Sequence, residues 1–300
     1  MKFKRVVLLS LCSITFSFSD TLGDLGSLVE EVEIKKHEQK EFLKDVFKQR
    51  MRTQLMARDA LLVATDFQKK KYLGELLENS KLFNDEIKSL FSKKEDISKI
   101  VKIVPDYPKR IERLTQTWDT FYKQIKVLSN DSNNEEALAF IISNNVLLLT
   151  DIDFILRKYI EFTKSSDTLA KAIQHKQLML FSQVGMPRAY IQKIIKEKLL
   201  INYETKVIEN RQNLDITINA LDRLLKALRE GDKTLGLDGT TEDKILEKLT
   251  FADSIWKSLK PLYQKELLSK EEFAMMLTKS EEFIVKYTEV ITLSNEKIDQ

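Results

Sequence analysis

Hydrophobic residues recur along this chain at spacings of three and four, which places them on one face of a helix. The pattern predicts eight helices, over residues 27–64, 67–91, 107–128, 134–163, 166–200, 203–230, 241–267 and 269–298. The breaks coincide with residues that interrupt helices, among them Pro105, Pro108 and the glycine-containing stretch 231–239. Only 7 Gly and 4 Pro occur in 300 residues, and charged residues make up 32%. The chain is therefore predicted to be all-α.

Similar segments indicate that the helical pattern is repeated. Trp118 and Trp256 lie in similar segments, each followed by apolar residues at helical spacing, and residues 133–155 parallel residues 269–291. Four helices occur in each half, so we expect two tandem antiparallel four-helix bundles, over residues 20–165 and 166–300. Continuous helical pattern around residues 162–168 leaves open whether one helix joins the two bundles.

The first 19 residues have the three parts of a secretory signal peptide: a basic start, an apolar run and small residues before Asp20. A retained anchor and a lipid-modified Cys12 are the alternatives. Cleavage would remove the only cysteine and leave 46 basic and 46 acidic residues. A neutral chain has no electrostatic footprint for nucleic acid. No later run of about 18 apolar residues is uninterrupted, so we expect a soluble periplasmic or secreted protein without a transmembrane segment.

The segment at residues 49–62, QRMRTQLMARDALL, places polar side chains where an amphipathic helix should be apolar. Arg50, Gln54 and Arg58 fall within the inward sector that the neighbouring leucine, phenylalanine and methionine residues define. Arg52 and Asp59 fall on the opposite side, with Lys48, and are expected to face water. A guanidinium that faces a helix bundle is costly unless it has a partner, which is either a protein carboxylate or a bound anion.

The motif Gln-Arg-Met-x-x-Gln-x-x-Ala-x-x-Ala-Leu-Leu at residues 49–62 resembles the first helix of the NarX-like and PilJ-type sensor domains. The resemblance covers most of residues 40–163. It implies a helical sensor domain in which inward arginines of two subunits clamp a small oxyanion such as nitrate or nitrite. On this resemblance Arg50 would be the primary clamp, with Gln54 and Arg58 as supporting donors.

The second half resembles the family less closely. Aligning Gln183 with Gln54 places Met179 at the position of Arg50 and Pro187 at the position of Arg58. Gln183 is therefore the one candidate ligand-binding residue of the second half. If the two repeats pack on each other, one arginine would face the ligand, whereas a homodimer would restore a symmetric pair. Pro187 predicts a kink in its helix, with or without a cleft beside it.

A structural interpretation competes with the ligand site. Arg50 and Arg58 could pair with carboxylates of another helix, for which Glu112, Asp151 and Asp153 are available. Two hypotheses follow. The first is an exported, sensor-type protein that binds a small anion or polar ligand without a signalling output of its own. The second is a helical interaction module that docks a membrane receptor or an envelope protein.

Catalytic chemistry has little support in the sequence. Nucleophile, phosphate-binding and dinucleotide-binding motifs are absent, and the pattern indicates neither an enzyme nor a cofactor. The two histidines, His37 and His175, lack neighbours at metal-ligand spacing, so we expect no metal site.

Overall fold

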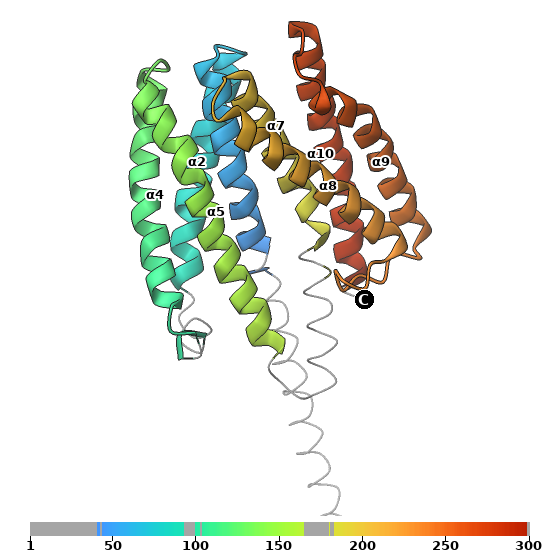
Figure 1. Ribbon diagram of the computed structural model, residues 1–300. Coiled ribbons are helices and arrows are strands. Elements are labelled where there is room, and N and C mark those ends of the chain that lie inside the picture. The colour runs from blue at the N-terminus through green and yellow to red at the C-terminus, as the bar shows by residue number, and fades with distance from the viewer. Residues whose placement is uncertain are drawn as a thin grey trace, which may run out of the picture. The chain divides into compact units, whose positions relative to one another are not determined.

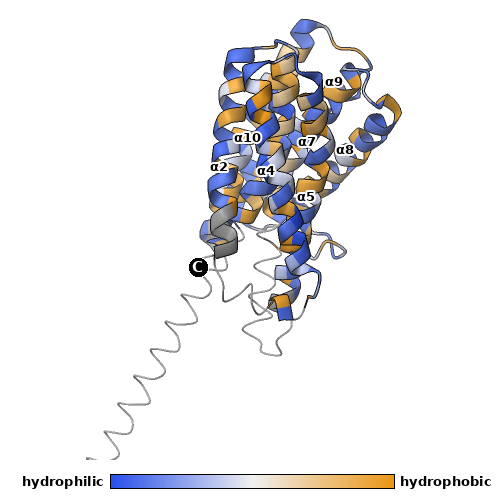
Figure 2. Ribbon diagram, turned by 90° about the vertical axis from the view of Figure 1, so that its left-hand side faces the viewer, coloured by the Kyte–Doolittle hydropathy of each residue, from blue (hydrophilic) through white to orange (hydrophobic). Residues whose placement is uncertain are grey.

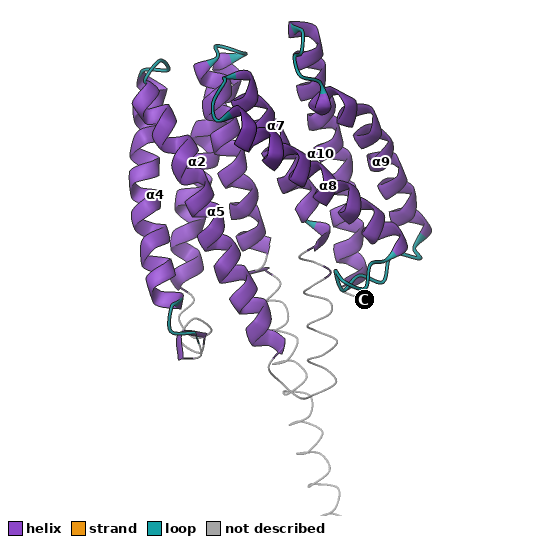
Figure 3. Ribbon diagram, viewed as in Figure 1, coloured by secondary structure: helices purple, strands orange, loops and turns teal. Residues whose placement is uncertain are grey.

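Leucine-, lysine- and glutamate-rich sequence with apolar residues every three to four positions forms helices almost throughout the computed structural model. The structure describes residues 41–42, 44–92, 100–102, 104–164, 180 and 183–298. Residues 44–64 are helical, and the further helices are α2 (Lys69–Ser92), α4 (Tyr107–Asn130), α5 (Glu135–Lys164), α7 (Met186–Asn202), α8 (Val207–Glu230), α9 (Asp243–Gln264) and α10 (Lys270–Ile298). The described residues contain no strand, only one isolated bridge between Asp232 and Leu237 (Figure 3).

Helices that follow one another in the chain pack side by side. α4 packs against α5, α7 against α8, and α9 against α10, while α2 contacts α4 and α10 contacts α7 (Figure 1). Short loops between neighbours make these pairs antiparallel. The predicted all-α fold of antiparallel bundles is confirmed. Residues 45–300 form one compact unit. The division into domains at residue 165 stays a prediction, and the segments at 1–19 and 165–179 lie outside the described residues.

The turn after the first helix of each half has the same geometry, 138 residues apart. Asp66 and Gln68 have φ values of 58° and 44°, and Glu204 and Lys206 have 53° and 43°. The backbone bonds match as well: the Asp66 amide donates to the Val63 carbonyl, and the Glu204 amide donates to the Ile201 carbonyl. Non-glycine residues seldom adopt left-handed backbone. Two such pairs at one spacing therefore fix the register of the repeat.

Side-chain contacts repeat at the same spacing. The indole Nε1 of Trp118 donates to Asn84, and that of Trp256 donates to Asp222, the equivalent position. The ion pair of Arg110 with Asp151 likewise has a counterpart in that of Lys248 with Glu289, at 3.1 and 3.0 Å. Both halves thus hold their third and fourth helices with the same contacts.

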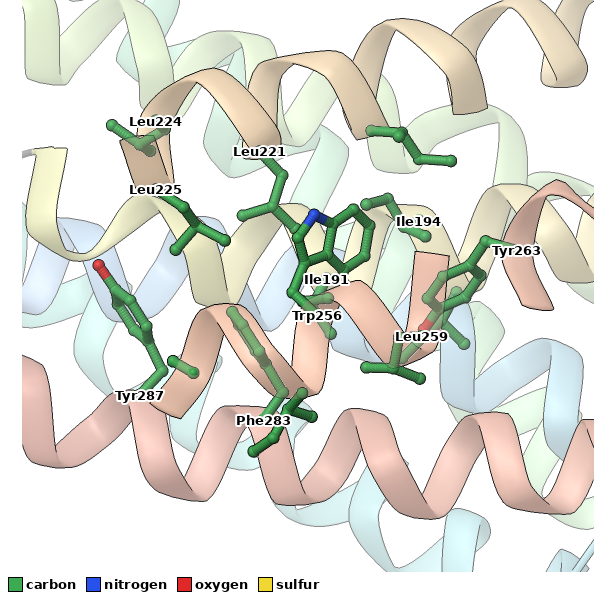
Figure 4. Packing of buried hydrophobic residues seen from close by; sticks show 14 of the residues in the cluster. Ile191, Ile194, Leu221, Leu224, Leu225, Trp256, Leu259, Tyr263, Phe283 and Tyr287 are labelled. Carbon is green, nitrogen blue, oxygen red and sulfur yellow. The ribbon is translucent and has the colours of Figure 1, made fainter. Parts of the chain in front are cut away.

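Large aromatic side chains fill the interior of the second half. Trp256, Tyr263, Phe283 and Tyr287 are almost completely buried and pack with leucines and isoleucines of α7 and α8 (Figure 4). The same cluster extends to Leu61, Leu62, Val63 and Tyr72 of the first half. Polar residues cover the outward faces, so hydrophilic and hydrophobic positions alternate along each helix (Figure 2). Each fully buried large side chain contributes about 1.5–3 kcal/mol.

One described helical segment, Glu135–Glu161 of α5, is long and apolar enough to cross a membrane by length and composition. One third of its most apolar window is buried. A core helix passes the same test, and α5 carries the completely buried Asn145 and Asp151. Localisation therefore stays a prediction.

Pro187 stands close to the start of α7, whose N-cap is Gly185. Proline is tolerated in the first turn because its missing N–H would have no partner there. The helix predicted over residues 166–200 is thus interrupted at Gly185 within its described part. No kink of α7 itself follows from Pro187.

Candidate functional site

The helix over residues 44–64 and α7 lie side by side and run in the same direction. Arg50 contacts Met186, Lys196 contacts Gln54, and the Tyr203 hydroxyl donates to the Leu61 carbonyl. Because contacts at increasing residue numbers of one helix meet increasing numbers of the other, the pair is parallel. We call the contact between these two helices the repeat junction.

The 138-residue register pairs each polar residue of the first motif with one on α7. Arg50 corresponds to Arg188, Gln54 to Gln192, Arg58 to Lys196, and Asp59 to Glu197. The alignment of Gln54 with Gln183 is therefore wrong, and the second repeat retains basic side chains at both arginine positions. Gln183 is partly buried and makes no hydrogen bond within the described parts of the chain.

Arg50 is paired with a carboxylate. Its Nε lies 2.5 Å from Oδ1 of Asp153, and its Nη1 donates to Sδ of Met186 at 2.8 Å. Burial raises the pKa of Asp153, although the neighbouring Arg50 and Arg157 oppose that rise. Of the three carboxylates considered for the arginines, Asp153 is thus the one that neutralises Arg50.

Arg188 occupies the equivalent position without such a partner. Within the described residues its guanidinium donates only to Sδ of Met51, at 3.1 Å, and its buried Nε has no hydrogen-bond partner. The position equivalent to Asp153 is Ile291. Burial lowers the pKa of Arg188, and the nearby Tyr287 opposes this shift. The Tyr287 hydroxyl is itself buried and unpartnered. The junction therefore carries one uncompensated cation at Arg188.

Arg58 is the centre of a saturated network. It donates to Asp59 at 2.7 Å, to Glu75 at 2.9 Å and to Gln192 of the other repeat at 2.8 Å. The guanidinium also lies over the Tyr72 ring, 5.5 Å from its centroid. Burial raises the pKa of Asp59 to about 7, against the opposing effect of Arg58. No donor of Arg58 is left for a ligand.

Gln54 belongs to a second buried network. Its Oε1 accepts from Lys196 at 3.1 Å, and its Nε2 donates to Asn145 at 3.3 Å and to Thr53 at 3.2 Å. Lys196 also donates to Asn145 at 3.2 Å. Burial lowers the pKa of Lys196 to about 8, with Glu197 opposing and Lys193 adding to that shift. Gln54 thus holds the two repeats together.

Two positions expected to face solvent are buried. Arg52 is 8% exposed and its guanidinium lies 2.5 Å from Glu86, while Asp59 is completely buried against Arg58. Lys48 is exposed, as predicted. Helix 44–64 is covered on more than one side, because both its own bundle and α7 pack against it. A single inward face was therefore the wrong model for this helix.

Arg188, Gln192 and Lys196 were missed by the sequence analysis. The signal that locates them is the spacing of Trp118 and Trp256, which equals the register of the turns. Applying that spacing to Arg50 leads directly to Arg188. The motif alignment instead followed a single glutamine.

Other features of the described residues point to no further site. No group of three or more histidine, cysteine, aspartate or glutamate side chains is placed there to hold a metal ion. A hollow of about 460 Å³ lies between α9 and α10 beside Phe251, but its lysines Lys248 and Lys286 are both paired with Glu289.

Comparisons with known proteins add no assignment. No family model matches the chain, and neither a curated protein nor a solved structure matches it significantly. The resemblance to the NarX-like sensor domains therefore depends on residues 49–62 and the helical pattern alone.

Proposed function

We propose that this protein is a non-enzymatic binding protein that takes a small monovalent anion at the repeat junction, beside Arg188. The observation that carries the proposal is the largely buried Arg188 guanidinium, which has no carboxylate partner in the described chain. A charge in such surroundings is costly unless an anion accompanies it. The two repeats would thus supply within one chain the pair of arginine-bearing helices that the family resemblance implies for two subunits.

The charges around the junction argue for a monoanion. Arg50 is neutralised by Asp153, so Arg188 leaves one positive charge to be balanced. A planar oxyanion such as nitrate or nitrite suits a guanidinium, because parallel N–H donors match two of its oxygens. The unpartnered Tyr287 hydroxyl offers a further donor beside Arg188.

A thermal-shift panel of nitrate, nitrite, chloride and sulfate with the purified protein tests the proposal. We expect nitrate or nitrite to raise the unfolding midpoint of the wild-type protein, and Arg188→Gln to abolish the shift. Arg50→Gln is the matched variant at the equivalent position. The shift should persist there, because Asp153 already occupies Arg50. No shift with any anion, or an equal shift in Arg188→Gln, would refute the assignment.

A helical interaction module is the second candidate. The pairing of Arg50 with Asp153 favours it, because the central arginine of the motif then serves packing. Exposed apolar side chains such as Val146 and Leu147 of α5 would be available to a receptor or an envelope protein. This candidate predicts co-purification with a partner and no response to any anion. The same thermal-shift panel therefore separates the two.

Membership of the NarX-like or PilJ-type sensor family and export to the periplasm or beyond belong to the same proposal. The motif at residues 49–62 supports the family, and the pattern of residues 1–19 supports export. N-terminal sequencing of protein recovered from the cell envelope or the medium tests the second point. A mature protein that begins at Asp20 is expected.

A further inference from the structure

Two guanidinium–thioether hydrogen bonds cross the repeat junction in opposite directions. Arg188 donates to Sδ of Met51, and Arg50 donates to Sδ of Met186. A thioether is a weak acceptor, so a guanidinium that ends on sulfur is poorly satisfied. Both methionines are partly exposed, whereas Met56 and Met276 are completely buried. The sulfur atoms beside the arginines are therefore within reach of a small oxidant.

We propose that Met51 is an oxidation site whose sulfoxide provides Arg188 with the acceptor that it lacks. Hydrogen peroxide would transfer one oxygen atom to Sδ: the S–O bond forms, the O–O bond breaks, sulfur is oxidised by two electrons and the peroxide leaves as water. The sulfoxide oxygen carries a large negative partial charge and accepts hydrogen bonds far better than the thioether does.

The two methionines differ in what their oxidation would achieve. Arg50 already has Asp153, so a sulfoxide at Met186 would compete with a carboxylate. Arg188 has no competing partner, so a sulfoxide at Met51 gains a charge-assisted hydrogen bond. Oxidation of methionine in a packed interior usually disrupts it. At Met51 we expect the opposite sign, because the new oxygen meets a buried cation.

Oxidation at Met51 would also regulate the proposed anion site, and this part of the inference rests on the proposed function. The sulfoxide oxygen and a bound oxyanion would compete for the same guanidinium donors. Oxidised protein is therefore expected to lose its response to nitrate, which would make the site sensitive to peroxide.

Peptide mass spectrometry of the full chain after graded peroxide treatment tests the modification. We expect Met51 to be oxidised with the protein still folded, at doses that oxidise Met275, which is 42% exposed. The unfolding midpoint should stay constant or rise in the wild type and fall in oxidised Arg188→Gln. Met51→Leu should remove the difference between treated and untreated protein, and Met186→Leu should retain it.

Two results would overturn the inference: a Met51 that stays reduced while Met275 is fully oxidised, or an oxidation-dependent loss of stability that is equal in wild type and Arg188→Gln. The nitrate response separates this inference from the proposed function. If reduced protein ignores nitrate while oxidation acts through Arg188, the ligand proposal fails and the modification stands. If nitrate binds reduced and oxidised protein equally, the regulatory part fails.

Discussion

Arg58 donates a hydrogen bond to Gln192, 134 positions further along the chain, at 2.8 Å. The equivalent bond in the other direction joins Lys196 to Gln54, at 3.1 Å. Each basic residue thus binds the glutamine that stands one turn before the basic residue of the other repeat. The exchange is isologous, as in a two-fold dimer, although both helices belong to one chain. The repeat junction is accordingly a built interface between the two repeats.

A double-mutant cycle measures this exchange. Arg58→Met and Gln192→Ala should each destabilise the protein, and their coupling energy in urea unfolding should reach about 1 kcal/mol or more, because the residues share a buried bond. Arg110→Gln combined with Gln192→Ala is the control, since Arg110 pairs with Asp151 on α5. Additivity of the first pair within error would contradict the contact.

Removal of the Arg58 guanidinium should be costly by itself. Arg58→Met leaves the completely buried Asp59 without its cation, and breaking a buried pair typically costs about 3–5 kcal/mol. Asp59→Asn in the Arg58→Met background should recover part of the free energy of unfolding, since it removes the stranded charge. Chemical denaturation of the three variants provides the measurement. A single variant as stable as the wild type would show that Asp59 is paired elsewhere.

The free energy of unfolding should have a minimum near pH 7–8 from two buried groups. The pKa of Asp59 is raised to about 7, so the folded state binds more protons than the unfolded chain below pH 7, and stability falls as pH rises towards that value. The pKa of Lys196 is lowered to about 8, so the unfolded chain binds more protons above pH 8. Stability therefore rises again with pH there.

Urea unfolding between pH 5 and 9.5 tests this minimum, with a slope of up to about 1.4 kcal/mol per pH unit from each group. Lys196→Met should remove the alkaline rise and Asp59→Asn the acidic fall, each without affecting the other limb. A monotonic pH profile that both variants leave unchanged would contradict the assignment.

The two tryptophans provide a matched pair for hydrogen-bond strength. Trp256 donates to the carboxylate of Asp222 at 2.5 Å, and Trp118 donates to the amide of Asn84 at 3.3 Å. Bonds to charged groups contribute about 1.5–3 kcal/mol and neutral ones about 1 kcal/mol. Asp222→Ala should therefore destabilise more than Asn84→Ala in urea unfolding followed by tryptophan fluorescence. Equal costs would show that the charge of Asp222 adds nothing.

Helix positions were predictable from the sequence because periodicity reports the inward face of each helix. The predicted and observed ends of the helices from α2 to α10 agree within four residues wherever both are described, apart from the late start of α7 at Met186. Asp153 was also among the carboxylates named for the arginines. Periodicity cannot report which helix covers that face, so the partners of Gln54 and Arg58 on α7 were not predictable. The register of the second repeat was predictable from the tryptophans, and the alignment through Gln183 obscured it.

Isothermal titration of the reduced, purified protein with nitrate tests the central claim most directly, because it reports both affinity and stoichiometry. If Arg188 forms the site within one chain, one nitrate binds per chain, Arg188→Gln removes the heat of binding, and Arg50→Gln leaves the stoichiometry unchanged. Binding of one nitrate per two chains, or binding that survives in Arg188→Gln, would contradict the account.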